Sequence, residues 1–270
     1  MNRAATGGNV AEWPGVDYHT HICEAPIDEM LASAVEQGVR EYGISEHIFQ
    51  LHEGHPIFPL IPDEGTRFSR QWYIETCLDR AATSPIDIRL GLEVDFVPGT
   101  EERVAQVLDG IAWDYLIGSV HEIDGVDLFE YVPEDVDDGQ RLWRRYGELL
   151  IAAVESGLFD VIAHPVRNMV RNPYVPSDVA DLFAAVAESA ARNQVALELN
   201  GEDTRRWPEM VRTLAKACSD ASCAVSLGSD AHRPASVAQS LRTATSIAAE
   251  TRVPGVMSFK RRDRHLIHLE

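Results

Sequence analysis

The stretch Gly15-Val16-Asp17-Tyr18-His19-Thr20-His21 is a short apolar run that ends in two histidines separated by one residue. In an extended backbone, residues i and i+2 point to the same face, so His19 and His21 can present two imidazoles to one ion. Asp17 lies one step back on that face, where it can orient a histidine through the other ring nitrogen. An HxH pair also arises by chance, so its meaning depends on whether the rest of the chain repeats this pattern.

Short apolar runs of this kind alternate with longer amphipathic stretches along the whole sequence. The predicted strands are Gly15–His19, Glu41–Ser45, Ile86–Glu93, Tyr115–Val120, Phe159–His164, Val195–Leu199 and Ala224–Ser229. The predicted helices are Ile27–Glu36, Arg67–Ala82, Thr100–Leu108, Asp138–Ser156, Ser177–Arg192, Pro208–Asp220 and Ala235–Ala248. Strand followed by helix, seven times, predicts a parallel sheet covered by helices.

At 270 residues the natural solution is one α/β domain, a closed or nearly closed (β/α)7 barrel. A doubly wound open sheet is the alternative, but no glycine-rich phosphate loop follows the first strand. We expect residues 1–270 to form this single domain, with its core at about 14–250 and a C-terminal tail at 251–270. His265 and His268 lie in that tail, where no catalytic part is expected of them.

Polar side chains recur where the apolar runs end, which in a parallel barrel is the end that carries the chemistry. The residues at these positions are His19, His21, Glu46, His47, Glu93, His121, His164, Asp230 and His232. Only the sixth run, which ends at Asn200, lacks such a residue. Taken alone, Glu93 is also consistent with a carboxylate in a salt bridge with an arginine. His121 or His164, taken alone, is equally consistent with a core histidine whose hydrogen bonds are satisfied. Jointly, the pattern predicts a metal site.

Apart from Glu46, these residues are six imidazoles and two carboxylates without sulfur, which favour Zn²⁺, Mn²⁺ or Fe²⁺ over Mg²⁺ or a thiolate site. One tetrahedral ion takes about four ligands, so this set predicts two or three divalent ions that share bridging ligands. Paired ions of this kind are a common means of attacking a phosphate ester.

The charge of the chain weakens other functional classes. With 24 Lys+Arg and 43 Asp+Glu, the formal net charge is −19, which disfavours nucleic acid as a partner. No apolar run is long enough for a membrane span, and residues 1–13 lack a secretory apolar region, so we expect a cytoplasmic protein without a membrane partner.

The four cysteines do not form a CxxC pair, and we expect them to be reduced residues that pack in the core: Cys23, Cys77, Cys218 and Cys223.

The order of these motifs resembles the PHP superfamily of metal-dependent phosphoesterases, from about Val16 to Ala238. Ser45-Glu46-His47, Gly91-Leu92-Glu93-Val94-Asp95-Phe96 and Leu197-Glu198-Leu199-Asn200-Gly201 are closest to its histidinol-phosphatase branch. The resemblance implies a distorted seven-stranded, TIM-like barrel.

The resemblance also implies a ligand set. One ion would be held by His19, His21, Glu93 and Asp230; Glu93 would bridge to a second ion completed by His121 and His164; His47 and His232 would serve a third. The family usually supplies a further histidine shortly after the HxH pair, but residues 22–28 contain none. Glu24 is our substitute candidate and Asp28 the second; otherwise the third ion is weak or absent.

Phosphate recognition calls for guanidinium groups, which bind phosphate oxygens in a fork. Arg167, Arg205 and Arg206 lie in loops at the active end and match regions where the family carries basic residues; a solvated surface arginine is the alternative for each. The loop His52–Pro62 is long enough for a lid, although we favour surface positions for its His52 and His55.

The sequence therefore predicts a phosphatase, a monomer or small homo-oligomer, that hydrolyses a small anionic phosphate ester by attack of a metal-bridging hydroxide. Glu93, Asp230 and His232 are the candidate catalytic residues, and L-histidinol phosphate is the expected substrate. A nucleotide or sugar phosphate is the alternative. Two further alternatives are weaker. An amidohydrolase-type enzyme would need a lysine in the middle of the barrel. A non-catalytic PHP module would need a partner domain.

Overall fold

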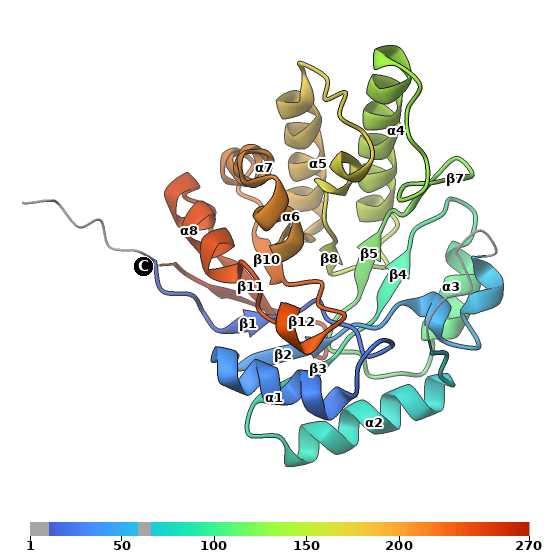
Figure 1. The fold of residues 1–270 in the computed structure, drawn as a ribbon, viewed down its shortest axis with the longest axis vertical. Helices are drawn as coiled ribbons and strands as arrows, with labels where there is room; N and C mark the ends of the chain where they lie inside the picture. The colour runs from blue at the N-terminus through green and yellow to red at the C-terminus, as the bar shows by residue number, and fades with distance from the viewer. Residues whose placement is uncertain (1–10, 59–65, 270) are drawn as a thin grey trace, which may run out of the picture.

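Short strands alternate with longer helices in the computed structural model, which describes residues 11–58 and 66–269 (Figure 1). The strands are β1 Val16–Asp17, β2 Glu41–Ile44, β3 Asp87–Leu90, β4 Glu93–Asp95, β5 Ile117–Ser119, β6 Glu122–Ile123, β7 Val126–Asp127, β8 Val161–Ile162, β9 Ala196–Asn200, β10 Val225–Gly228, β11 Val256–Lys260 and β12 Asp263–Ile267. The α-helices are α1 Ile27–Gln37, α2 Arg70–Thr83, α3 Glu101–Leu108, α4 Val136–Glu155, α5 Val179–Asn193, α6 Gly201–Arg206, α7 Pro208–Asp220 and α8 Leu241–Thr251. Single 3₁₀ turns lie at Ile48–Gln50, His55–Ile57, Arg167–Val170 and Pro234–Ser236. The predicted α/β class is confirmed.

The strands fall into two main sheets. One has the order β1-β2-β3, and the other the order β12-β11-β10-β9-β8-β5-β4. All pairs are parallel except the C-terminal β11–β12 pair and the small β6–β7 hairpin. The carboxyl ends of the parallel strands therefore meet at one end of the molecule, as the sequence predicts.

The third predicted strand, Ile86–Glu93, is interrupted at Gly91 and forms both β3 and β4. A Cβ at Gly91 would lie 2.3 Å from the Tyr115 ring, so only glycine lets the buried tyrosine pack here. Before the break the chain pairs with β2, and after it with β5. One continuous segment thereby belongs to both sheets.

At the other side, β1 approaches β10 through isolated contacts rather than a ladder. The amide of Tyr18 donates to the Leu227 carbonyl at 2.9 Å, and Thr20 forms a single parallel bridge with Ala231. A closed seven-stranded barrel is therefore not confirmed: the strands form two sheets, one of them mixed. The cause is the shortness of β1, whose two residues are paired with β2.

Helices cover the outer faces of both sheets, with α4, α5, α7 and α8 along the large sheet and α1 and α2 along the small one (Figure 1). Each predicted helical stretch overlaps a helix, although the boundaries shift; α8, for example, begins at Leu241 rather than Ala235. Helix α2 begins three residues later than predicted, because the Ser69 hydroxyl accepts a hydrogen bond from the Trp72 amide. Within the described ranges, no helix has both the length and the hydropathy that a bilayer crossing requires.

The segment predicted as a C-terminal tail instead forms the β11–β12 hairpin at the edge of the large sheet. Buried Phe259 packs edge-on against Tyr18 at 5.2 Å between ring centroids. The buried carboxylate of Asp160 accepts from Arg262 at 2.9 Å and from Arg264 at 2.8 Å. We predicted a tail because this segment follows the last predicted strand–helix unit, whereas its arginines fasten it to the domain.

We expect Asp160→Ala to destabilise the protein by about 2–3 kcal/mol, since two arginines and the Leu116 amide lose a charged acceptor. Urea unfolding followed by circular dichroism measures this change in the free energy of unfolding. Asp178→Ala is the matched control, because its pair with Arg144 is half exposed and worth little. Equal stability of the two variants would contradict the anchoring role.

Candidate metal centre

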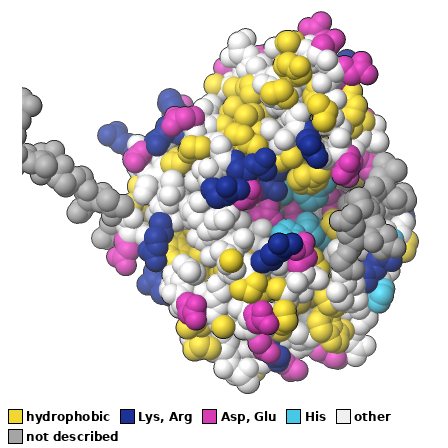
Figure 2. Space-filling view, viewed as in Figure 1, with side chains coloured by type: hydrophobic (Ala, Val, Ile, Leu, Met, Phe, Trp, Pro, Cys, Tyr) yellow, Lys and Arg dark blue, Asp and Glu magenta, His cyan; other side chains and the backbone are white. Residues whose placement is uncertain are grey.

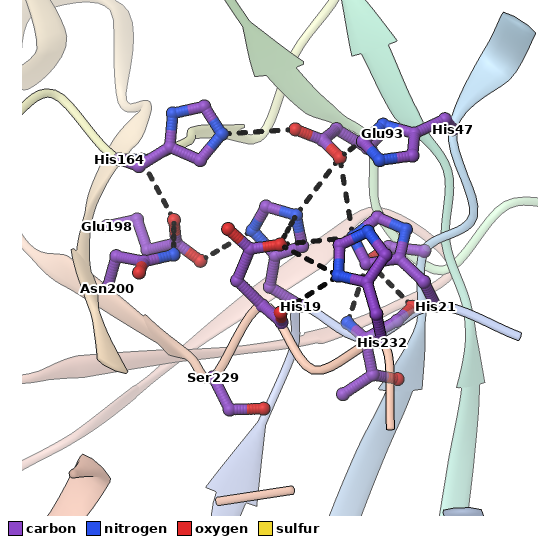
Figure 3. A network of polar contacts seen from close by, with 12 residues as sticks. His19, His21, His47, Glu93, His164, Glu198, Asn200, Ser229 and His232 are labelled. Carbon is purple, nitrogen blue, oxygen red and sulfur yellow. Dashed lines mark hydrogen bonds and ion pairs between the residues drawn. The ribbon is translucent and has the colours of Figure 1, made fainter. Parts of the chain in front are cut away.

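The eight candidate ligands lie together at the carboxyl end of the sheets: the six strand-end histidines, Glu93 and Asp230. Figure 3 shows His19, His21, His47, Glu93, His164 and His232 around one point, although they are up to 213 positions apart. The strands that carry them end here, so each side chain follows its strand into the same space. The structure thus brings these residues together at one end of the molecule.

Glu93 is the centre of the cluster and is fully buried. Its Oε2 lies 3.1 Å from His19 Nε2 and 2.8 Å from His47 Nδ1. Its Oε1 lies 3.2 Å from His164 Nε2 and 3.6 Å from His121 Nε2. Because the two oxygens face different histidines, this carboxylate has the geometry of a bridging ligand.

Asp230 faces the same cluster from the loop after β10. Its Oδ1 lies 3.3 Å from His21 Nε2 and 3.7 Å from His19 Nε2. Asp230 and His164 both have positive φ angles, 60° and 33°. Such backbone geometry costs free energy outside glycine and is concentrated at functional sites.

Three imidazole rings stack beside this group. The ring of His21 stacks on that of His47 and on that of His232, with centroid distances of 4.2 and 4.1 Å, and the rings of His47 and His232 lie 5.7 Å apart. Together these three residues offer ligand atoms within 4.8 Å of one another. They lie where a further ion would be expected from the sequence.

Four overlapping triads in the described residues have the spacing of metal sites. They are His19-Glu93-His164, His19-His21-Asp230, His47-Glu93-His121 and His21-His47-His232. Within the described part of the chain, several of their buried atoms lack a hydrogen-bond partner, namely His19 Nε2, His21 Nε2, His47 Nδ1 and Glu93 Oε2. Buried polar atoms normally have partners, so this donor set fits divalent cations with a preference for nitrogen and oxygen ligands.

A second layer of carboxylates orients the histidines. His19 Nδ1 contacts Glu198 at 2.9 Å, His21 Nδ1 contacts Glu46 at 3.4 Å, and His121 Nδ1 contacts Asp95 at 2.6 Å. A carboxylate on one ring nitrogen directs the other nitrogen toward a metal.

For Glu198, Glu46 and Asp95 we predict no orienting role from the sequence alone. Asp95 shares a strand face with Glu93, and Glu198 lies inside an apolar strand, where a carboxylate needs a buried partner; these were the available signals. Asp17, which we predicted to orient a histidine, was the wrong choice. Its carboxylate accepts from the Ser229 hydroxyl at 2.6 Å and from the Ala238 amide at 2.9 Å, because it points toward the loop after β10.

Charges within the cluster set the protonation of the histidines. Burial lowers the pKa of His21, but the nearby carboxylates of Asp230 and Glu46 outweigh it and raise this pKa to about 9. Burial and the nearby Arg167 charge lower the pKa of His164 to about 4. A divalent ion would therefore compete with a proton at His21, whereas His164 is ready to bind as the neutral ligand.

The substitute candidates for the missing histidine are not brought into the cluster. Glu24 lies at the rim, 3.1 Å from Arg233, and belongs to none of the triads of described residues. Asp28 is exposed on α1 and forms an ion pair with Arg80 at 2.6 Å. The missing histidine therefore has no counterpart at the expected place.

The three predicted phosphate-binding arginines separate into two kinds. Arg167 is buried beside Asp230, with Nη2 2.7 Å from Oδ2. Arg205 is exposed and paired with Glu202, and Arg206 stacks over Trp207 at 4.5 Å. Arg233, which we did not single out, lines the cavity instead, since it follows His232 directly.

A cavity of about 650 Å³ opens above the cluster. Figure 2 shows histidine and acidic side chains within a hollow of this face, with basic side chains beside it. Its walls include Phe49, Phe129, Asp127 and Glu130. His52 is exposed and His55 contacts Arg67, and neither lines the cavity; the end of the predicted lid, residues 59–62, lies outside the described residues.

Comparisons with known proteins find a family model and similar sequences. The model of the PHP domain matches residues 17–202. A protein of Deinococcus radiodurans named "Probable histidinol-phosphatase" is 38% identical over 161 residues, and the match spans 56% of this chain and 60% of that protein. A protein of Escherichia coli named "Probable phosphatase YcdX" is 27% identical over 228 residues, 80% of this chain and 78% of that protein.

The solved structure of histidinol phosphate phosphatase from Lactococcus lactis, complexed with zinc, L-histidinol and phosphate, has a TM-score of 0.76 to this chain. It is 18% identical and covers 92% of this chain and 98% of that one. At this identity the likeness shows a shared fold.

Proposed function

Since the chain belongs to the PHP domain family, we propose that it is a metal-dependent phosphomonoesterase. The observation that carries the proposal is the Glu93 carboxylate, whose two oxygens face two sets of histidines at 2.8–3.6 Å. This arrangement suits two or three divalent ions, Zn²⁺, Mn²⁺ or Fe²⁺. When bound, such ions activate water near neutral pH and stabilise charge on a phosphoryl group.

The eight candidate ligands are assigned to the ions as follows. His19, His21, Glu93 and Asp230 would hold one ion, and His121 and His164 would complete a second with Glu93. His47 and His232 would serve a third, with His21 beside them rather than Glu24.

We propose L-histidinol phosphate as the substrate. The named relatives support it, and so does the cavity wall. Among the described residues, Asp127 and Glu130 line the cavity without a cationic partner, so they suit a substrate whose organic part is positively charged. Phe129 lies 5.4 Å from the ring of His121 and offers an aromatic face for an imidazole.

The direct test is phosphate release by the purified protein with Mn²⁺ or Zn²⁺, from L-histidinol phosphate and from a panel of nucleotide and sugar phosphates. We expect histidinol phosphate to have the highest kcat/KM. A sugar phosphate or nucleotide that reacts faster by orders of magnitude would reject the substrate but keep the phosphatase; no turnover of any ester would reject both.

Metal removal is expected to abolish turnover. Dialysis against a chelator should reduce the rate more than about 100-fold, because no side chain in the cluster replaces the Lewis acid. Readdition of Zn²⁺, Mn²⁺ or Fe²⁺ should restore it, and elemental analysis should then find two or three ions per chain. Full activity at less than one ion per chain would contradict the proposal.

A further inference from the structure

Arg167 is held by three acceptors in the floor of the cavity. Its Nε donates to Asp203 Oδ1 at 2.7 Å, and its Nη2 donates to Asn200 Oδ1 at 3.0 Å and to Asp230 Oδ2 at 2.7 Å. Nη1 has no hydrogen-bond partner among the described residues, and the side chain lines the cavity. The guanidinium is therefore fixed along one side, which leaves one terminal nitrogen for a ligand.

The contacts continue from Arg167 to other candidate metal ligands. Asn200 Nδ2 donates to Glu198 Oε2 at 3.0 Å, and the same oxygen accepts from the His164 amide at 2.8 Å. Glu198 Oε1 contacts His19 Nδ1 at 2.9 Å. Figure 3 shows Asn200, Glu198, His164 and His19 in this arrangement, so the position of Arg167 is tied to the geometry of the cluster.

Asp203 belongs to this network but contacts none of the candidate metal ligands through its side chain; its carboxylate accepts from Arg167. It belongs to none of the metal-type triads of described residues, yet it is 1% exposed at the start of α6. Its amide is capped by Asn200 Oδ1 at 3.1 Å, which sets its carboxylate against Arg167. Burying a carboxylate costs free energy unless it is paired. The burial of Asp203 is therefore explained by its ion pair with Arg167.

Charge balance gives the reason for this pairing. Arg167 carries one positive charge, and Asp230 has to offer its own negative charge to His21, His19 and an ion. Without Asp203, Arg167 would have Asp230 as its single anionic contact and would compete with the ion for that carboxylate. With Asp203 present, Arg167 has a second carboxylate partner on its other side, at 2.7 Å.

We propose that Asp203 is a positioning residue that holds Arg167 so that one guanidinium orients Asp230 and also offers Nη1 to the phosphate of the substrate. The role rests on the proposed function, since it assigns a phosphate to the cavity.

The first experiment measures inorganic phosphate binding to the metal-loaded protein by calorimetry, together with kcat and KM. Asp203→Asn keeps the size of the side chain and an oxygen acceptor but removes the charge. We expect the Kd for phosphate and the KM to rise about tenfold with metal content unchanged, as for a weakened charge-assisted contact. Asp220→Asn is the control, because its pair with Lys216 is exposed on α7.

A double-mutant cycle with Arg167→Met then separates positioning from general stability. If Asp203 acts through Arg167, adding Asp203→Asn to Arg167→Met should leave the Kd for phosphate unchanged. This pair also replaces a buried ion pair by neutral groups, which folds more readily than a half-broken pair. Independent, multiplicative effects would overturn the proposal, as would a Kd for Asp203→Asn within twofold of the wild type.

The two proposals fail in different ways. If the wild-type protein binds phosphate but hydrolyses no ester, the proposed function is rejected and the cycle on phosphate binding still tests Asp203. If the wild-type protein turns over esters but the cycle shows no coupling, Asp203 has no positioning role and the phosphatase proposal stands.

Discussion

Replacing Glu93 by glutamine is expected to lower kcat about 1000-fold, an increase of about 4 kcal/mol in the activation free energy. The amide can still accept with one oxygen, but its nitrogen would face two of the histidines that now lie 2.8–3.6 Å from carboxylate oxygens. A side chain that holds two ions loses its effect on both at once. Steady-state kinetics with histidinol phosphate and elemental analysis of the same preparation measure the loss, and we expect at least one ion fewer per chain.

Glu102→Gln provides the matched control. This glutamate is exposed in the first turn of α3 and neither lines the cavity nor belongs to the triads of described residues. It should keep wild-type kinetics and metal content. Full metal content in Glu93→Gln together with activity near that of the wild type would show that Glu93 does not bridge.

Replacing Asp230 by alanine is expected to reduce turnover more than about 100-fold and to lower metal content. Two effects add up here: Oδ1 no longer faces His19 and His21, and Arg167 loses one of its two anionic partners. The variant should remain folded, because Asp203 still pairs with Arg167 at 2.7 Å. Circular dichroism, metal analysis and kinetics test these three statements separately.

Asp181→Ala is the control for this substitution, because Asp181 is exposed in the first turn of α5. If Asp230→Ala kept normal metal content but lost activity, Asp230 would act on the substrate rather than on an ion, and our ligand assignment for it would be wrong.

The repeated strand–helix pattern was sufficient to predict the positions of most elements, because each apolar run is short, buried and followed by an amphipathic stretch. What it could not predict is how the strands divide between sheets. That depends on the packing of Tyr115 against Gly91 and on the two-residue length of β1, which are tertiary facts. The C-terminal hairpin could not be predicted because its second strand, β12, is polar and largely exposed. Its place at the edge of the large sheet is also a tertiary fact.

The site was predictable where a side chain follows a strand directly, since strand direction alone then fixes its place. Glu198 and Asp95 are different, because their role is visible only through the distance to a histidine from another strand. The arginines show the limit most clearly. Arg167, Arg205 and Arg206 are alike in sequence terms, yet one is buried under three acceptors and the other two face solvent.

The contacts between β1 and the loop after β10 also have a consequence for the order of events in folding. Asp17 bonds Ser229 across 212 positions of the chain, and the histidines that follow Asp17 meet Asp230 in the same region. During synthesis, His19 and His21 leave the ribosome long before their partners exist. Contacts between such distant residues slow the search for the native state, because the entropy of closing a long loop opposes them. The full ligand set exists only after β1 meets the loop after β10, so an ion bound before that contact would be held by a partial set.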